Sequence, residues 1–441
     1  MKLKMFKRIT VAMLLTMTTL MGCVGNEKSS VDDVTESEVS AGDKSENDEE
    51  SSNEDINVTF WSLSTRQDAL EPIIEEFNKT NEEGIKVTGA YYSTDGIKDA
   101  CKVGATSNTL PNMWFNWGGA LGSFYVDNDL TYDLTQYAID NDWKSKFAEN
   151  TLALSTFNEK LSGYPTSYNV LGIYYRKDIF DKYNLEEPET LEEFEEICAI
   201  LKENGVTPMF TGGLNGWHTM RFIEQLIEHY AGPELHDSMN TFVESYNNDA
   251  SIKAFEKYKE FCEKGYFPDG FVTQDPDDYM IALASSQCAM DLQGQWYDGK
   301  ILEEGLNMDD YGVFPFPSND SHRLSSFGEM TQFNVKNTPE ELEACIKFMD
   351  YYYSAENVEK YPEFFKLPLT YVGSTMADDQ PLSAELLVHG DNNGTFTITD
   401  QAFPPEIADV LFYAQDAIAN GQMEPKAAAT SISDAIDAYD K

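Results

Sequence analysis

INVTFWSLSTRQDALEPIIEEFNKTNEEGIKVTGAYY, residues 56–92, contains a strand pattern, a helix pattern and a second strand pattern in succession. INVTFW and IKVTGAYY are typical of strands, and RQDALEPIIEEFNKT between them is typical of a helix. A third strand is expected at NMWFNW, residues 112–117, after another helix. This alternation predicts α/β layers built on a largely parallel sheet.

Further along the chain, two helices are marked by their first residues. In PETLEEFEEICAILKENG, Thr190 and Glu193 have the spacing of a capping box, in which each residue satisfies a backbone N–H of the other. NTPEELEACIKFMDYYY repeats the arrangement with Thr338 and Glu341. The α/β pattern therefore extends well beyond the first three strands.

Length and charge limit the classes of protein to consider. With 441 residues, the chain exceeds one ordinary core and suggests two lobes or domains. Its 77 acidic and 31 basic residues give a net charge of −46. This charge argues against binding nucleic acid or anionic lipid through a basic patch.

The N-terminus has the features of an export signal. Basic residues between Lys2 and Arg8 precede the apolar run VAMLLTMTTLMG, which is too short to span a bilayer comfortably. The run ends in Leu20, Met21, Gly22 and Cys23, which resemble the bacterial lipobox. This resemblance implies a signal peptide over residues 1–22 and a diacylglycerol group on the Cys23 thiol. An ordinary signal peptide or a membrane anchor is the alternative.

The segment after the signal is poor in apolar residues. Residues 24–55 hold twelve acidic and two basic side chains. Such a composition favours disorder and self-repulsion. We interpret residues 23–55 as a lipidated cysteine followed by an acidic tether.

Motifs for common catalytic chemistries are missing from the sequence. It contains no GxGxxG, P-loop, GxSxG or HExxH pattern, and its five histidines are scattered. The cysteines are widely spaced and form no CxxC pair. We therefore predict no metal site, no cofactor and no catalytic residue. A pair of carboxylates for glycoside hydrolysis stays open, because the sequence does not give the distance between them.

Aromatic residues recur in polar surroundings where strand patterns end, and ligands of open α/β sheets bind at the carboxyl ends of strands. Asn116 directly precedes Trp117, and Arg66 follows Trp61. Indole faces and flanking amides suit a sugar ring, which has C–H faces and hydroxyl edges. The tryptophans concerned are Trp61, Trp117, Trp217 and Trp296.

Two stretches resemble one protein family. Residues 160–208 contain Gly-x-Pro, a strand ending in Tyr-x-Lys-Asp, and Pro-x-Thr before an acidic helix. ALASSQCAMDLQGQWYDG, residues 282–299, is similar to the family's Ala-Met strand followed by Gly-x-Trp. The chain thus resembles the carbohydrate-type extracellular solute-binding proteins of bacterial ABC importers, which are related in fold to maltose-binding protein.

The resemblance implies a two-lobed, type II periplasmic-binding-protein-like fold with a ligand cleft at the hinge. The expected lobes are residues 56–168 plus 325–362, and residues 169–324 plus 363–441. The implied protein is a monomer that is not an enzyme. It captures a mono- or oligosaccharide and, through hinge closure, delivers it to ABC permease subunits. The chain has only four arginines after the tether, which favours a neutral sugar over a strongly anionic one. It would be lipid-anchored on the extracellular face of the cytoplasmic membrane of a Gram-positive bacterium.

The resemblance also implies roles for individual residues. Trp296 corresponds to the residue that stacks on the sugar, and Asn116 and Trp117 correspond to the wall of the first lobe. An aromatic at the first crossing is Tyr164 or Tyr168. The other residues implied at the cleft are Asn169, Glu329, Trp61 and Arg66.

Two other classes of function stay open at this point. One is a surface-attached glycoside hydrolase or lyase, and the other is a sugar sensor that is not coupled to import. An amino acid, a peptide or a metal as cargo is also open.

Overall fold

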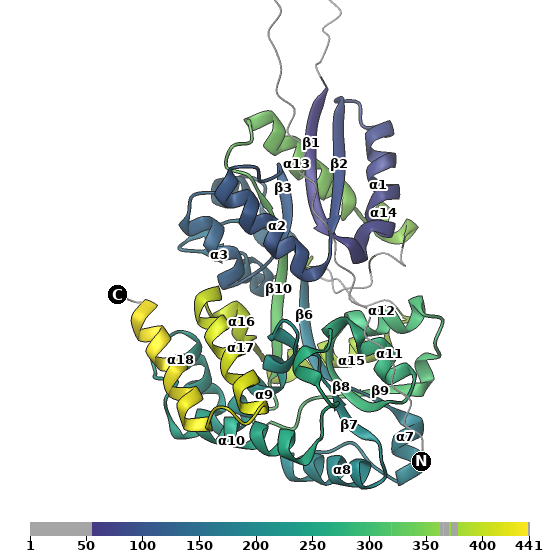
Figure 1. Cartoon of the computed structure of the whole chain (residues 1–441). Helices are drawn as coiled ribbons and strands as arrows, with labels where there is room; N and C mark the ends of the chain where they lie inside the picture. Colours follow the sequence, from purple (N-terminus) through teal and green to yellow (C-terminus); the bar gives the residue numbers. More distant parts are fainter. Residues whose placement is uncertain (1–54, 319, 362–364, 366–369, 372–377, 440–441) are drawn as a thin grey trace, which may run out of the picture. The chain divides into compact units, whose positions relative to one another are not determined.

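In the computed structural model, the opening stretch forms a strand, a helix and a parallel strand, as predicted (Figure 1). These are β1 (Ile56–Leu63), α1 (Gln67–Thr80) and β2 (Ile85–Tyr92), with Ile56 opposite Ile85. The apolar side of α1 is buried, because residues such as Ile73 and Phe77 lie against the core. The predicted third strand is β3 (Met113–Trp117), and all of its residues are buried.

The structure describes residues 55–318, 320–361, 365, 370–371 and 378–439. These residues belong to the unit Asn53–Lys441. The predicted signal peptide, Cys23 and all of the predicted tether except Asp55 lie outside the described residues. No helix in the described part of the chain is long and apolar enough to span a membrane.

Two long strands occupy the middle of the sheet, whose order is β2-β1-β3-β10-β6-β8-β7. They are β6 (Gly163–Arg176) and β10 (Leu324–Phe333), which pair antiparallel along most of their length. The other strands of the second half are β7 (Thr207–Phe210), β8 (Cys288–Gly294), β9 (Tyr311–Phe314) and β11 (Thr395–Thr397).

The prediction of a largely parallel sheet is wrong. Parallel pairs join β1 to β2 and to β3, β7 to β8, and β10 to β11, but β6 and β10 run antiparallel to each other. In addition, β10 is antiparallel to β3, and β6 is antiparallel to β8 and β9. The sheet is mixed because these two strands return against the direction of their neighbours.

Both long strands change partners along their length (Figure 1). In β6, the residues up to Val170 pair with β10, and the residues from Leu171 onward pair with β8. The predicted crossing at 168/169 falls inside β6, and the one at 324/325 falls at the start of β10. The third predicted crossing, at 362/363, lies outside the described residues. The lobe boundaries themselves stay predictions.

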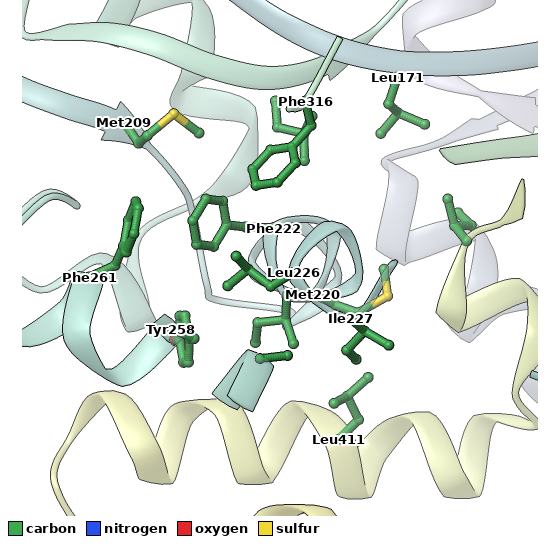
Figure 2. Packing of buried hydrophobic residues seen from close by; sticks show 14 of the residues in the cluster. Leu171, Met209, Met220, Phe222, Leu226, Ile227, Tyr258, Phe261, Phe316 and Leu411 are labelled. Atoms are coloured by element: carbon green, nitrogen blue, oxygen red, sulfur yellow. The ribbon is translucent and has the colours of Figure 1, made fainter. Parts of the chain in front are cut away.

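The largest core surrounds α9 (Trp217–Asn240), which packs beside α10 (Asp249–Lys264) and α17 (Pro405–Ala419); α18 (Pro425–Tyr439) packs in turn on α10 and α17. Figure 2 shows Phe222 of α9 between Phe261 and Phe316, and Ile227 near Leu411 of α17. The ring centroids of Phe222 and Phe261 are 5.0 Å apart. This packing fixes the first turn of α9, which contributes to the site described below.

Both predicted capping boxes are confirmed. Thr190 caps α8 (Leu191–Glu203) by accepting from the Glu193 N–H, and the Glu193 carboxylate accepts from the Thr190 N–H. Thr338 and Glu341 form the same pair at α13 (Pro339–Tyr352).

The remaining elements connect these layers. The first group of helices comprises α2 (Thr94–Ser107), α3 (Ala120–Asp127), α4 (Thr135–Asp140), α5 (Trp143–Lys146), α6 (Glu149–Leu154) and α7 (Lys177–Tyr183). The later helices are α11 (Tyr279–Ala284), α12 (Trp296–Glu303), α14 (Ala355–Lys360), α15 (Pro381–Asn393) and α16 (Thr399–Ala402). A separate two-stranded sheet is made of β4 (Thr156–Phe157) and β5 (Lys160–Leu161).

Candidate ligand-binding site

Two adjoining pockets lie between α2, β3 and α3 on one side and α9, α16 and α17 on the other. The larger pocket has a volume of about 320 Å³, and its lining includes Asn116, Tyr125, Asn215 and Phe412. The smaller pocket has a volume of about 40 Å³, and its lining includes Arg221, Phe327, Ile398 and Gln401. The residues common to both linings are Lys98, Trp117, Leu121, Trp217 and Asp400.

Trp117 lies at the carboxyl end of β3 and lines both pockets, where the sequence placed a candidate aromatic wall. Its ring meets that of Phe115 at a centroid distance of 4.7 Å and an angle of 82°. The Lys98 Nζ lies 4.9 Å from the centroid of the Trp117 ring and 3.3 Å from Asp95 Oδ1. In this structure a cation therefore covers part of the predicted aromatic wall.

Trp217 begins α9 and Arg221 follows one helical turn later, four residues on, so the two side chains share one side of the helix. The Arg221 guanidinium lies 4.4 Å from the centroid of the Trp217 ring and 5.2 Å from that of Trp296. Gly216 precedes this turn at a φ of 76°, and a Cβ there would come within 2.4 Å of the Phe412 ring. Glycine thus permits both the backbone conformation and the close approach of α17.

Trp296 lies at the start of α12, directly after β8. Trp217 and Trp296 are each the first residue of a helix, directly after Gly216 and Gln295 at the caps. Trp296 Nε1 donates to Gln293 Oε1 at 3.1 Å, and the ring is half-buried beside Phe327. Trp296 lines neither pocket itself, but two of its neighbours, Arg221 and Phe327, line the smaller one.

Asn116 lines the larger pocket, but its side-chain polar atoms already form hydrogen bonds within the protein. Its Nδ2 donates to Gln332 Oε1 at 2.8 Å, and its Oδ1 accepts from the Trp117 N–H at 2.8 Å. The side chain therefore holds the end of β3 in place.

Arg66 and Glu329 form an ion pair in which Nη2 and Oε2 are 2.5 Å apart. Ser167 also donates to this carboxylate, and the Arg66 guanidinium lies 4.7 Å from the centroid of Phe115. Burial lowers the pKa of Arg66, but Glu329, Tyr353 and Tyr352 together outweigh the effect of burial, so that the pKa of Arg66 is raised. Neither residue lines the two pockets.

The other sequence candidates also lie away from the two pockets. Tyr164 is fully buried, and its hydroxyl donates to Asp350 Oδ1 at 2.7 Å. The Tyr168 hydroxyl bonds to that of Thr395 at 2.7 Å. Asn169 is buried beside Ser167, and Trp61 packs on Tyr92 with centroids 5.3 Å apart. The structure thus brings together Asn116, Trp117 and Trp217, with Trp296 next to them.

Several lining residues were not singled out from the sequence. Lys98, Arg221, Asp400 and Gln401 all line the smaller pocket. The sequence offered one indication for Arg221, which is its position one helical turn after Trp217. The others carried no signal in the sequence, because they belong to helices whose relation to β3 depends on the tertiary fold.

The smaller pocket encloses polar atoms that have no hydrogen-bond partner among the described residues. The donors are Nε and Nη1 of Arg221 and Nε1 of Trp217, and the acceptors are Oδ1 of Asp400 and Oε1 of Gln401. Burial lowers the pKa of Arg221 against the opposing effect of Asp400, and burial raises the pKa of Asp400. Enclosed groups without partners are costly, and a polar ligand would satisfy them.

Within the described residues, no group of three or more His, Cys, Asp or Glu could hold a metal ion. Four of the five cysteines in this part of the chain are buried, and all five are free.

Known proteins resemble this chain in both sequence and structure. The bacterial extracellular solute-binding protein family matches residues 61–359. A multiple sugar-binding protein of Streptococcus mutans is 23% identical over 348 residues, which cover 76% of this chain and 79% of that protein. A galactooligosaccharide-binding protein of Bacillus subtilis is 21% identical over 300 residues, which cover 67% of this chain and 68% of that protein.

Two solved structures illustrate the likeness in fold. A chitin oligosaccharide binding protein superposes with a TM-score of 0.79 at 20% identity, covering 87% of this chain and 98% of that one. A solute-binding protein in complex with raffinose superposes with a TM-score of 0.73 at 18% identity, covering 88% of this chain and 100% of that one. They confirm the predicted two-lobed, type II periplasmic-binding fold, and the family match shows that this chain belongs to the bacterial extracellular solute-binding proteins.

Proposed function

We propose that this protein captures a sugar or oligosaccharide outside the cell and delivers it to an ABC importer when its lobes close. The names of its relatives support a sugar cargo, since they include a multiple sugar-binding protein and a galactooligosaccharide-binding protein. The proposed role is binding without catalysis. Only a ligand that favours the closed state would drive closure.

The observation that carries this proposal is the pair of pockets. Their linings combine aromatic rings, such as Trp117 and Trp217, with polar atoms that lack partners. A sugar offers C–H faces for the rings and hydroxyls for the polar atoms. At about 320 Å³, the larger pocket lies at the lower end of the range for small-molecule sites.

The proposal also includes a cellular location and protein partners. A lipid on Cys23 would anchor the protein, as a monomer, to the extracellular face of the cytoplasmic membrane of a Gram-positive bacterium. Residues 23–55 would let the lobes reach the permease subunits. The lobes are proposed as residues 56–168 plus 325–362, and residues 169–324 plus 363–441.

A thermal-shift screen of the purified full-length protein against neutral mono- and oligosaccharides tests the cargo. A ligand that binds the folded state alone stabilises it by about 2.7 kcal/mol at a hundred times its Kd, so a cognate sugar raises the Tm. Trp217→Ala is expected to lower the affinity about tenfold or more, which corresponds to about 1.4 kcal/mol. Isothermal titration calorimetry measures this loss.

Tyr413→Ala is the control, because Tyr413 is an exposed aromatic of α17 that lines neither pocket. It should bind the sugar like the wild type. A Tm that rises with amino acids or peptides and with no sugar would contradict the proposed cargo. New reducing ends after incubation with oligosaccharides would instead favour a glycoside hydrolase.

A further inference from the structure

Arg221 is a buried cation whose charge is poorly balanced by its neighbours. Its side chain is 8% exposed, and Nε and Nη1 have no partner among the described residues. Asp291 is engaged by His218 at 3.2 Å and by Gln293 at 2.9 Å. Glu224 does not line the smaller pocket, and its Oε2 accepts from the Thr399 N–H at 2.9 Å; burial also raises the pKa of Glu224 to about 8. Asp400 is the carboxylate left to balance Arg221 in the smaller pocket.

The surroundings of Arg221 restrict how its guanidinium is used. Trp217 and Trp296 both lie within stacking distance, at 4.4 and 5.2 Å. Gln293 holds the Trp296 ring through the indole N–H. Rings that pack on a guanidinium stabilise the cation without using its N–H groups. Nε and Nη1 of Arg221 therefore remain without a hydrogen-bond partner from the described residues.

The unpartnered atoms of the smaller pocket include both donors and acceptors. Arg221 and Trp217 present N–H groups, and Asp400 and Gln401 present oxygens. A carboxylate could accept from Arg221 but would face the Asp400 oxygen with no proton to donate. An ammonium group could donate to Asp400 and Gln401, but it has no lone pair to accept from Arg221 or Trp217. A hydroxyl donates and accepts at once, so it can satisfy both sides.

The second cation of the pocket also acts on Asp400. Lys98 lies 3.3 Å from Asp95 and rests against the Trp117 ring, and its positive charge, like that of Arg221, lowers the pKa of Asp400 against the effect of burial. Arg221 and Asp400 remain as one positive and one negative group on the same small cavity.

We propose that Arg221 and Asp400 determine specificity by bridging one hydroxyl of an uncharged sugar. This inference rests on the proposed sugar-binding function and deepens it. The hydroxyl accepts from the guanidinium and donates to the carboxylate, and in doing so it joins the helix α9 to α16. Trp296 acts as a positioning residue, because it contacts the guanidinium without lining the pocket.

The test uses the full-length protein and a neutral sugar found in the screen, with affinities measured by calorimetry. Arg221→Met and Asp400→Asn are each expected to weaken binding by about 10- to 100-fold, the range for hydrogen bonds to charged groups. The double variant should lose less than the product of the two single losses, since both act on one hydroxyl. A deoxy sugar that lacks this hydroxyl should bind the wild type and Arg221→Met alike.

Lys253→Met is the matched control, because Lys253 is exposed on α10 and lines neither pocket. The Tm without ligand adds an independent measurement. Arg221→Met should keep or raise it, because the substitution removes a buried cation that lacks hydrogen bonds. A sharp fall would show that Arg221 has a structural role and would overturn the proposal.

Three other outcomes separate the two proposals. If Arg221→Met binds the neutral sugar like Lys253→Met, the bridging role is wrong although the sugar function stands. If a uronic acid binds more tightly than its neutral counterpart and depends on Arg221 alone, the site recognises a carboxylate and the bridge is wrong. If the wild type binds no sugar at all, the proposed function fails together with the inference.

Discussion

Glu224 and Arg221 lie one turn apart on α9 and are buried in the same part of the protein. Burial is the largest cause of the raised Glu224 pKa, and repulsion from Asp400 adds to it. The hydrogen bond from the Thr399 N–H, at 2.9 Å, acts in the opposite direction. The protonation of this buried carboxylic acid therefore contributes to the stability of the folded protein.

This proton predicts how stability depends on pH. From about pH 4.5 to about pH 8, the unfolded chain has lost the Glu224 proton but the folded protein keeps it. Each unit rise in pH then lowers the free energy of unfolding by up to about 1.4 kcal/mol. Glu224→Gln mimics the protonated form and should lose this part of the pH dependence. Urea unfolding between pH 5 and pH 8 measures it.

Glu256→Gln removes one acidic group from an exposed position of α10 and is the control. Its pH dependence should match that of the wild type. Equal slopes for Glu224→Gln and the wild type would show that Glu224 is ionised in the folded protein.

The contact between α3 and α16 depends on a single glycine. Gly119 precedes α3 with a φ of 64° and a ψ of −146°, a conformation that only glycine adopts readily. A Cβ at this position would lie 2.1 Å from the backbone carbonyl oxygen of Gln401. Because Leu121 of α3 and Gln401 of α16 both line the smaller pocket, this contact sets the spacing of its walls.

Gly119→Ala is expected to reduce both stability and sugar affinity. The backbone conformation costs roughly 1–3 kcal/mol, and the steric contact adds about 1–3 kcal/mol as overpacking. Gly205→Ala is the control, since Gly205 also has a positive φ but no atom within 4 Å of its Cβ position. It should lose stability through the backbone alone and keep its affinity. Denaturant unfolding and calorimetry distinguish the two effects, and equal losses would contradict this account.

The protein as a whole is expected to change shape when it binds. The two pockets draw residues from α2 and β3 on one side and from α9 and α17 on the other. The strands β6 and β10 connect the two halves of the sheet, and hinges of this kind absorb the rotation in few residues. A ligand that contacts both sides stabilises the closed state.

Small-angle X-ray scattering should therefore show a smaller radius of gyration at saturating sugar. Trp217→Ala, measured at the same sugar concentration, should stay closer to the ligand-free value, because one wall of the pocket has lost its contact. An unchanged radius in the wild type, with binding confirmed by calorimetry, would show that capture occurs without closure.

Local features of this protein follow from residues that are close in the chain. The first strands, the helix α1 and both capping boxes were predicted because periodicity and caps depend on residues a few positions apart. Trp117 and Trp217 were identified in the same way, from their polar, glycine-rich surroundings. The resemblance of two short stretches was enough to predict the protein family.

Long-range contacts decided the rest. The antiparallel return of β6 and β10 depends on pairing between distant residues, which strand patterns do not encode. Tyr164 has the same residue type as a sugar platform, but its burial against Asp350 is visible only in three dimensions. The pocket joins Lys98, Trp217 and Asp400 from three separate helices. Its unpartnered atoms exist because burial removes water from them, and burial is a property of the folded chain.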